Sequence, residues 1–117
     1  MKGIVVGGNI RCLLKLAGTP YWPNMKDKIL LLESRSGGAD RMTACLSQLE
    51  QMGVFEQIKG IFLGTFTEME MKQSQPGIET LVKEMAGNKI PIAKTQEIGH
   101  GTDSKRLLIG EYAEFKN

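Results

Sequence analysis

The sequence has few of the residues from which metal sites and disulfide frameworks are built. Its 117 residues include one histidine and two cysteines, Cys12 and Cys45, and these three do not fall at a zinc-ligand spacing. We therefore predict no metal and no cofactor, and we expect two buried free thiols in preference to a disulfide. Free thiols are typical of a reducing compartment, so we expect a cytoplasmic protein.

The sequence also lacks long apolar runs and a strong excess of charge. No apolar run approaches the roughly 20 residues that span a bilayer, and the segment after Met1 is too short for a secretory signal. The 15 basic and 13 acidic residues give a formal net charge of +2, without a basic stripe. We therefore expect no membrane partner and no nucleic-acid partner. A chain of this size can form one domain, residues 1–117, with its own core.

What the sequence does contain is an alternation of apolar runs and amphipathic stretches. Strands are expected over 3–7, 28–32, 58–64 and 90–94, with helices after the N-cap Asn9, over 39–52 and from Pro76. The apolar residues of 28–32 do not alternate, which is typical of a parallel strand covered on both faces. Residues 33–38 and 65–75 are expected to be mobile loops, and 106–109 with 111–115 an antiparallel hairpin. The predicted fold class is α/β with a mostly parallel sheet.

The candidate site combines a carboxylate at a strand end with the chain's only histidine. Glu33 follows the apolar run 29–32, and ligands gather outside the carboxyl ends of strands in open α/β sheets. His100 lies between Gly99 and Gly101, which would let the ring project into a cleft. A histidine base oriented by a carboxylate forms two thirds of a nucleophilic triad. Each residue also has an ordinary interpretation, Glu33 as a solvated strand-end charge and His100 as a surface or packing residue.

The third member of such a triad, an activated nucleophile, is not evident. No serine lies in a Gly-x-Ser-x-Gly elbow between a strand and a helix. The serines are Ser34, Ser36, Ser47, Ser74 and Ser104. Cys12 and Cys45 fall on apolar helix faces, which favours inert thiols. The sequence therefore shows a base and its orienter with nothing to activate.

Short motifs along the whole chain resemble the carboxy-terminal domain of the LD-carboxypeptidases, a family of serine peptidases. In order they are Gly7-Gly8-Asn9-Ile10, Gly18-Thr19-Pro20-Tyr21, Ile29 to Glu33, Asp40-Arg41-Met42, Leu49, Gly53-Val54-Phe55, Gly60-Ile61-Phe62-Leu63-Gly64, Ile90-Pro91 and Gly99-His100-Gly101. Each motif alone is weak, whereas their order and spacing together are specific. The resemblance implies a swivelling β/β/α domain, with a mostly parallel sheet, a smaller antiparallel layer and helices on one side.

The resemblance also implies a Ser-His-Glu triad, in which Glu33 and His100 take the glutamate and histidine positions. The family's serine stands in an amino-terminal domain that is expected to be absent here, so this chain alone is expected to be inactive. The motif around His100, followed by Thr102-Asp103-Ser104, is more similar to the murein-recycling branch, which removes terminal D-alanine from murein tetrapeptides. The implied partners are a murein peptide, the amino-terminal domain and, as family members are often homodimers, a second copy.

Three other functions remain compatible with these residues. The first is that of the family's other branch, the microcin C immunity peptidases, which would make this chain part of an acyl-nucleotide peptide hydrolase. The second is a phosphocarrier or small binding domain, since a histidine on a glycine-rich loop can accept a phosphoryl group and Gly7-Gly8-Asn9 can cradle an anion. The third is a non-catalytic interaction domain. The mass of one added phosphoryl group, after incubation with phosphoryl donors, would identify the phosphocarrier.

Overall fold

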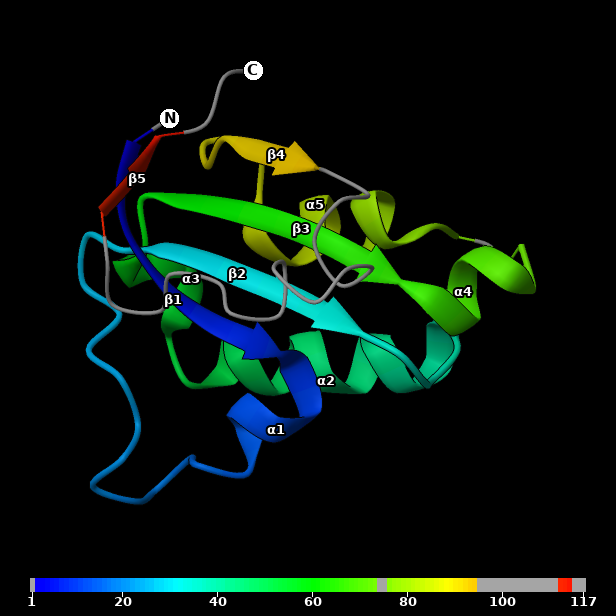
Figure 1. Ribbon diagram of the computed structural model, residues 1–117, viewed down its shortest axis with the longest axis horizontal. Coiled ribbons are helices and arrows are strands. Elements are labelled where there is room, and N and C mark those ends of the chain that lie inside the picture. The colour runs from blue at the N-terminus through cyan, green and yellow to red at the C-terminus, as the bar shows by residue number, and fades with distance from the viewer. Residues whose placement is uncertain (1, 74–75, 95–111, 115–117) are drawn as a thin grey trace.

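The computed structural model describes residues 2–73, 76–94 and 112–114, the last three by their backbone alone. These residues form a five-stranded sheet in the order β4-β3-β2-β1-β5 (Figure 1). The strands are β1 (Lys2–Asn9), β2 (Ile29–Ser34), β3 (Gly60–Phe66), β4 (Ile92–Lys94) and β5 (Tyr112–Glu114). The helices are α1 (Ile10–Leu14), α2 (Ala39–Gln51), α3 (Val54–Gln57), α4 (Thr67–Met71) and α5 (Ile78–Ala86). Strands β1 to β4 are parallel, which confirms the predicted α/β class.

The main core lies between the sheet and the helices on one of its faces (Figure 1). From the sheet it receives Val6, Leu30, Leu32, Ile61 and Leu63, and from the helices it receives apolar residues of α1, α2, α3, α4 and α5. A second cluster on the opposite face consists of Val5, Ile29, Leu31 and Phe62. The unbroken apolar run of β2 therefore supplies both faces, as expected of a central parallel strand.

Local sequence signals account for where α1 begins and where α2 ends. The Asn9 side-chain oxygen accepts hydrogen bonds from the N–H groups of Arg11 and Cys12, both at 3.0 Å, so the predicted N-cap is confirmed. The apolar stripe of α2 is fully buried at Met42, Leu46 and Leu49. Helix α2 ends just before Gly53, whose φ of +78° is readily adopted only by glycine.

Two predictions for the segment from residue 65 to the start of α5 are wrong. Residues 65–75 were expected to be a loop, but β3 continues through Phe66 and α4 follows directly. Phe66 and Met69 are 1% and 3% exposed, so two apolar residues three positions apart anchor this helical turn on the core. Pro76 is not the first helical residue either, because α5 begins at Ile78 with Gly77 as its N-cap.

The expected antiparallel layer is not confirmed. Strand β5 pairs antiparallel with β1, with Lys2 opposite Glu114 and Ile4 opposite Tyr112, so it extends the main sheet. Residues 106–109, the other strand of the predicted hairpin, lie outside the described residues. Within the described ranges, no helix has both the length and the apolar character needed to cross a bilayer.

The two cysteines are free thiols in different environments. Cys12 is exposed on α1, whereas Cys45 is half-buried on α2. The expectation of burial is wrong for Cys12, because in the short α1 it is Ile10 and Leu13 that face the core. Burial raises the pKa of the Cys45 thiol, although nearby arginine side chains oppose this effect.

We expect iodoacetamide at about pH 8 to alkylate Cys12 roughly tenfold faster than Cys45, because the thiolate is the nucleophile and burial limits both ionisation and access. A time course of peptide mass spectrometry measures the two rates in the same sample. The Cys12→Ser variant serves as the control and should leave the slow rate of Cys45 unchanged. Equal rates for the two thiols would contradict this expectation.

Candidate functional site

Polar residues gather at the carboxyl edge of the sheet, where β1 and β2 end. In the register of these strands, Asn9 lies beside Glu33. Glu33 is half-buried and is the penultimate residue of β2, which continues to the buried Ser34. Open α/β sheets bind ligands at this edge. Glu33 therefore stands where a working carboxylate is expected.

The pairing of β2 with β3 is irregular at Glu33. Leu32 pairs with Leu63, and Ser34 pairs with Phe66, so Glu33 faces a two-residue segment of β3, 64–65. Such a β-bulge bends the strand and re-aims neighbouring side chains, and bulges are common beside active sites. The glycine at position 64, inside an apolar strand pattern, is the sequence signal from which this bulge could have been anticipated.

Two serines near Glu33 are engaged in structural hydrogen bonds. The Ser34 hydroxyl, on a residue 3% exposed, donates to the Ser36 carbonyl oxygen at 2.7 Å. The Arg11 guanidinium donates to the Ser36 hydroxyl oxygen at 2.9 Å. These bonds tie the loop after β2 to the strand itself and to α1. These hydrogen bonds indicate that the two serines stabilise the loop. They do not show a serine hydroxyl held by a base, as a nucleophile would be.

Glu68, in α4, fastens the same loop and was not anticipated from the sequence. Its Oε1 atom accepts a hydrogen bond from the Gly37 N–H at 3.1 Å, and its own backbone N–H donates to the Arg35 carbonyl oxygen at 3.1 Å. The Lys72 ammonium donates to Oε2 at 3.3 Å. Residues 33 and 34 belong to β2, so the expected loop is confined to 35–38, and hydrogen bonds tie it to β2, α1 and α4.

The environment of Glu68 favours its carboxylate form. The hydrogen bond from the Gly37 N–H lowers the pKa of Glu68, and the hydrogen bond from Lys72 lowers it further. Desolvation acts in the opposite direction but is the smaller effect. The side chain is 31% exposed, so water also screens the ion pair with Lys72. Glu68 is therefore an ionised acceptor for the loop near neutral pH.

We expect Glu68→Gln to remove part of the acid sensitivity of folding. Because the folded state lowers the pKa of Glu68, its stabilisation is fully present above the ordinary value of 4.5 and is lost as the pH falls through the lowered pKa. Thermal denaturation between about pH 7 and pH 3 should show the gap in Tm between wild type and variant narrowing below about pH 4.5. Glu84→Gln, at an exposed position of α5, is the control with the same charge change. A gap for Glu68→Gln that stays constant over this range would contradict the expectation.

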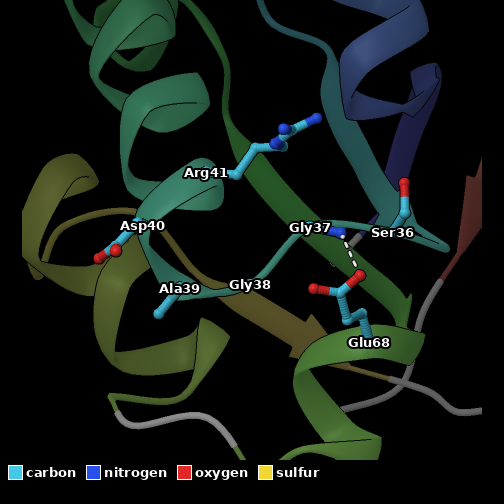
Figure 2. A pocket seen from close by; sticks show the side chains of 7 residues that line it. All are labelled: Ser36, Gly37, Gly38, Ala39, Asp40, Arg41 and Glu68. Atoms are coloured by element: carbon cyan, nitrogen blue, oxygen red, sulfur yellow. Dashed lines mark hydrogen bonds between the residues drawn. The ribbon is translucent and has the colours of Figure 1, made fainter.

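A polar pocket opens beside the loop, with a volume of about 790 Å³ (Figure 2). It is lined by Ser36, Gly37, Gly38, Ala39, Asp40, Arg41 and Glu68. Figure 2 shows Glu68 reaching up to Gly37 from α4, while Arg41 projects from the first turn of α2 and Asp40 points away from Glu68. Gly37 has a φ of +107°, and a side chain there would press on Met42 and Arg41. The pocket lies beside the loop that follows Glu33 in the chain.

His100, the second predicted site residue, lies outside the described residues, and its approach to Glu33 stays a prediction. The structure therefore places one of the two predicted site residues. It also shows the bulge in β3 opposite that residue and Glu68 bonded to the loop that follows it. Over residues 2–73, 76–94 and 112–114, no three His, Cys, Asp or Glu side chains are grouped so as to hold a metal ion.

The sequence is similar to a family of peptidase domains. The family model described as "LD-carboxypeptidase C-terminal domain" matches residues 2–115. A Treponema pallidum protein called "Putative carboxypeptidase" is 34% identical over 118 residues, covering 94% of this chain and 33% of that protein. "Putative carboxypeptidase slr1534" of Synechocystis is 28% identical over 117 residues, covering 97% of this chain and 39% of that protein. The chain thus spans between 33% and 39% of the length of these curated relatives.

Solved structures share the fold. The structure of MccF in complex with glutamyl sulfamoyl guanosine superposes with a TM-score of 0.69 and 22% identity, covering 82% of this chain and 29% of that chain. The crystal structure of muramoyltetrapeptide carboxypeptidase from Oxalobacter formigenes gives a TM-score of 0.67 at 21% identity, covering 96% of this chain and 38% of that chain. At these identities the likeness establishes the arrangement of the chain in space.

Proposed function

Because this chain belongs to the LD-carboxypeptidase family as a carboxy-terminal domain, we propose that it supplies Glu33 and His100 of a Ser-His-Glu triad. The serine would be carried by an amino-terminal domain of the same peptidase. The observation that carries the proposal is the position of Glu33, at the carboxyl end of the middle strand of the sheet and opposite a bulge in β3. In each of the two relatives, more than 60% of the length lies outside the match, since the match covers 33% and 39%.

In the proposed mechanism, His100 takes the proton of the serine hydroxyl while the serine oxygen attacks the peptide carbonyl carbon. Glu33 accepts a hydrogen bond from the other ring nitrogen, which fixes the tautomer and stabilises the imidazolium that forms. The imidazolium then protonates the leaving amine, and the terminal D-amino acid departs from an acyl-enzyme. Water, deprotonated by His100, hydrolyses that ester and regenerates the serine. The oxyanion would be held by backbone amides of the serine-bearing domain.

The substrate we propose is a murein tetrapeptide with D-alanine at its carboxyl end. Support comes from the motif around His100 and from the muramoyltetrapeptide carboxypeptidase that shares this fold. The pocket beside Gly37 offers space for a polar part of such a peptide. Recycling of murein peptides would occur in the cytoplasm, and we propose that the complete peptidase works there as a homodimer.

The proposal is tested by comparing residues 1–117 with a joined protein. We define the joined protein as the amino-terminal part of the Treponema pallidum relative, followed by residues 1–117 in place of its matching region. Released D-alanine is measured after incubation with a murein tetrapeptide. We expect release by the joined protein and none by residues 1–117 alone. D-alanine release by residues 1–117 alone, or no release by a folded joined protein, would overturn the assignment.

A second candidate is hydrolysis of an acyl-nucleotide peptide, which the likeness to MccF favours. That protein was solved with glutamyl sulfamoyl guanosine, an aminoacyl-nucleotide analogue. The same joined protein distinguishes the two candidates when it is offered a peptidyl acyl-nucleotide beside the tetrapeptide. Turnover of the nucleotide conjugate without release of D-alanine would favour the second candidate over the first.

A further inference from the structure

We propose that Glu68 is a positioning residue for Glu33, acting through the loop that links β2 to α2. The inference rests on the proposed function, because it assigns Glu68 a part in the reaction that Glu33 would serve. Glu68 is separated from Gly37 by 31 positions in the sequence, yet the two residues are hydrogen-bonded. The proposed task of Glu68 is to keep the end of β2, and with it Glu33, in one orientation.

Two hydrogen bonds at Glu68 continue the pairing of β2 and β3 beyond the ends of the strands. The Glu68 N–H donates to the Arg35 carbonyl oxygen, and the Gly37 N–H donates to Glu68 Oε1, both at 3.1 Å. The first involves the residue two positions after Glu33, and the second the residue four positions after it. We call this pair of bonds the Glu68 clamp.

The clamp matters because Glu33 sits at the irregular point of the sheet. On one side of the bulge the register is fixed by Leu32 and Leu63, and on the other by Ser34 and Phe66. A bulge interrupts the regular ladder and re-aims the side chains beside it, so the contacts that follow it help to set the local geometry. The clamp supplies such contacts, so the direction of the Glu33 side chain depends on an acceptor located in α4.

The chemistry of the acceptor gives a way to separate positioning from general packing. Glutamine at position 68 keeps a carbonyl oxygen that can accept the Gly37 N–H, whereas alanine removes it. A positioning role therefore predicts that the Glu68→Gln variant of the joined protein retains most of its kcat, whereas the Glu68→Ala variant loses it. A small displacement of a catalytic group can cost about 100-fold in rate. We accordingly expect Glu68→Ala to lower kcat of the joined protein about 10- to 100-fold, with KM changed less than about threefold.

The first experiment uses residues 1–117 and needs no activity. Hydrogen exchange of the Gly37 amide should accelerate at least about tenfold in Glu68→Ala and remain slow in Glu68→Gln, because only the alanine variant loses the acceptor. The titration of the Glu33 carboxyl carbon, followed by NMR, should shift more in Glu68→Ala than in Glu68→Gln, which removes the same charge but keeps an acceptor. Loss of Gly37 protection with an unchanged Glu33 titration would overturn the inference, as would unchanged protection in Glu68→Ala.

The second experiment measures D-alanine release by the joined protein and separates the two proposals. An active wild type whose Glu68→Ala variant keeps kcat within about twofold would overturn the role of Glu68 while leaving the proposed function standing. A folded but inactive wild type, with the Gly37 and Glu33 signals behaving as expected in residues 1–117, would overturn the proposed function and leave the clamp as a structural device that orients Glu33. A kcat close to wild type in Glu68→Gln, together with a lowered kcat in Glu68→Ala, supports the inference.

Discussion

Glu33→Gln is expected to lower kcat for D-alanine release by the joined protein about 10³- to 10⁴-fold, the largest effect on activity that we foresee. Glutamine has nearly the shape of glutamate and can occupy the same position at the end of β2. It carries no charge to stabilise an imidazolium, and its amide can hold the ring in the wrong tautomer. The structure around position 33 should therefore survive while the chemistry fails.

The matched control for this prediction is Glu56→Gln, which makes the same change at an exposed position of α3. Circular dichroism should show equal folding for both variants, and a coupled assay for D-alanine gives kcat. His100→Ala should cause a loss of similar size, and the double variant should be little worse than either single one, because residues of a triad act as a unit. A Glu33→Gln variant within about tenfold of wild type would remove Glu33 from the proposed triad.

Gly7→Ala is expected to lower the free energy of unfolding by about 2–4 kcal/mol, the largest effect on stability among our predictions. Gly7 has a φ of +112°, and a Cβ atom built there would collide with the Leu31 carbonyl oxygen of the neighbouring strand. Gly7 and Leu31 are partners in the register of β1 and β2, so the strands would have to separate in the middle of the sheet. The change therefore adds steric overlap to backbone strain.

Urea denaturation measures this loss and a control resolves its two causes. Gly18→Ala changes a residue with a φ of +80° at which an added Cβ atom would meet nothing within 4 Å, so it introduces backbone strain of its own without the overlap. We expect Gly18→Ala to cost about 1 kcal/mol. An equal loss in both variants would show that the approach of Gly7 to Leu31 does not limit the packing of β1 on β2.

The parts of the fold that the sequence predicted well are those fixed by neighbouring residues. The Asn9 side chain supplies the hydrogen-bond acceptor at the start of α1. The buried apolar residues Met42, Leu46 and Leu49 recur at helical spacing in α2. The elements that were missed depend on distant contacts. The turn of α4 exists because Phe66 and Met69 reach a core built by other segments.

The same contrast between local patterns and distant contacts holds for the candidate site. Glu33 was predicted because it ends an apolar run, which is visible within a few positions of the chain. Glu68 was missed because its role depends on Gly37, and no local pattern in the acidic stretch around it signals that pairing. Cys12 was misjudged because helical spacing alone does not say how far a short helix extends over the core.

The pairing of Lys2 with Glu114 bears on the layout of the two-domain peptidase proposed above. Residues near both extremities of the chain meet at one margin of the sheet, and β1 runs from there to Asn9, the neighbour of Glu33. Seven steps along an extended strand cover about 23 Å. If the serine-bearing domain proposed above precedes Lys2, it would have to span that length of β1 to bring its hydroxyl to Glu33.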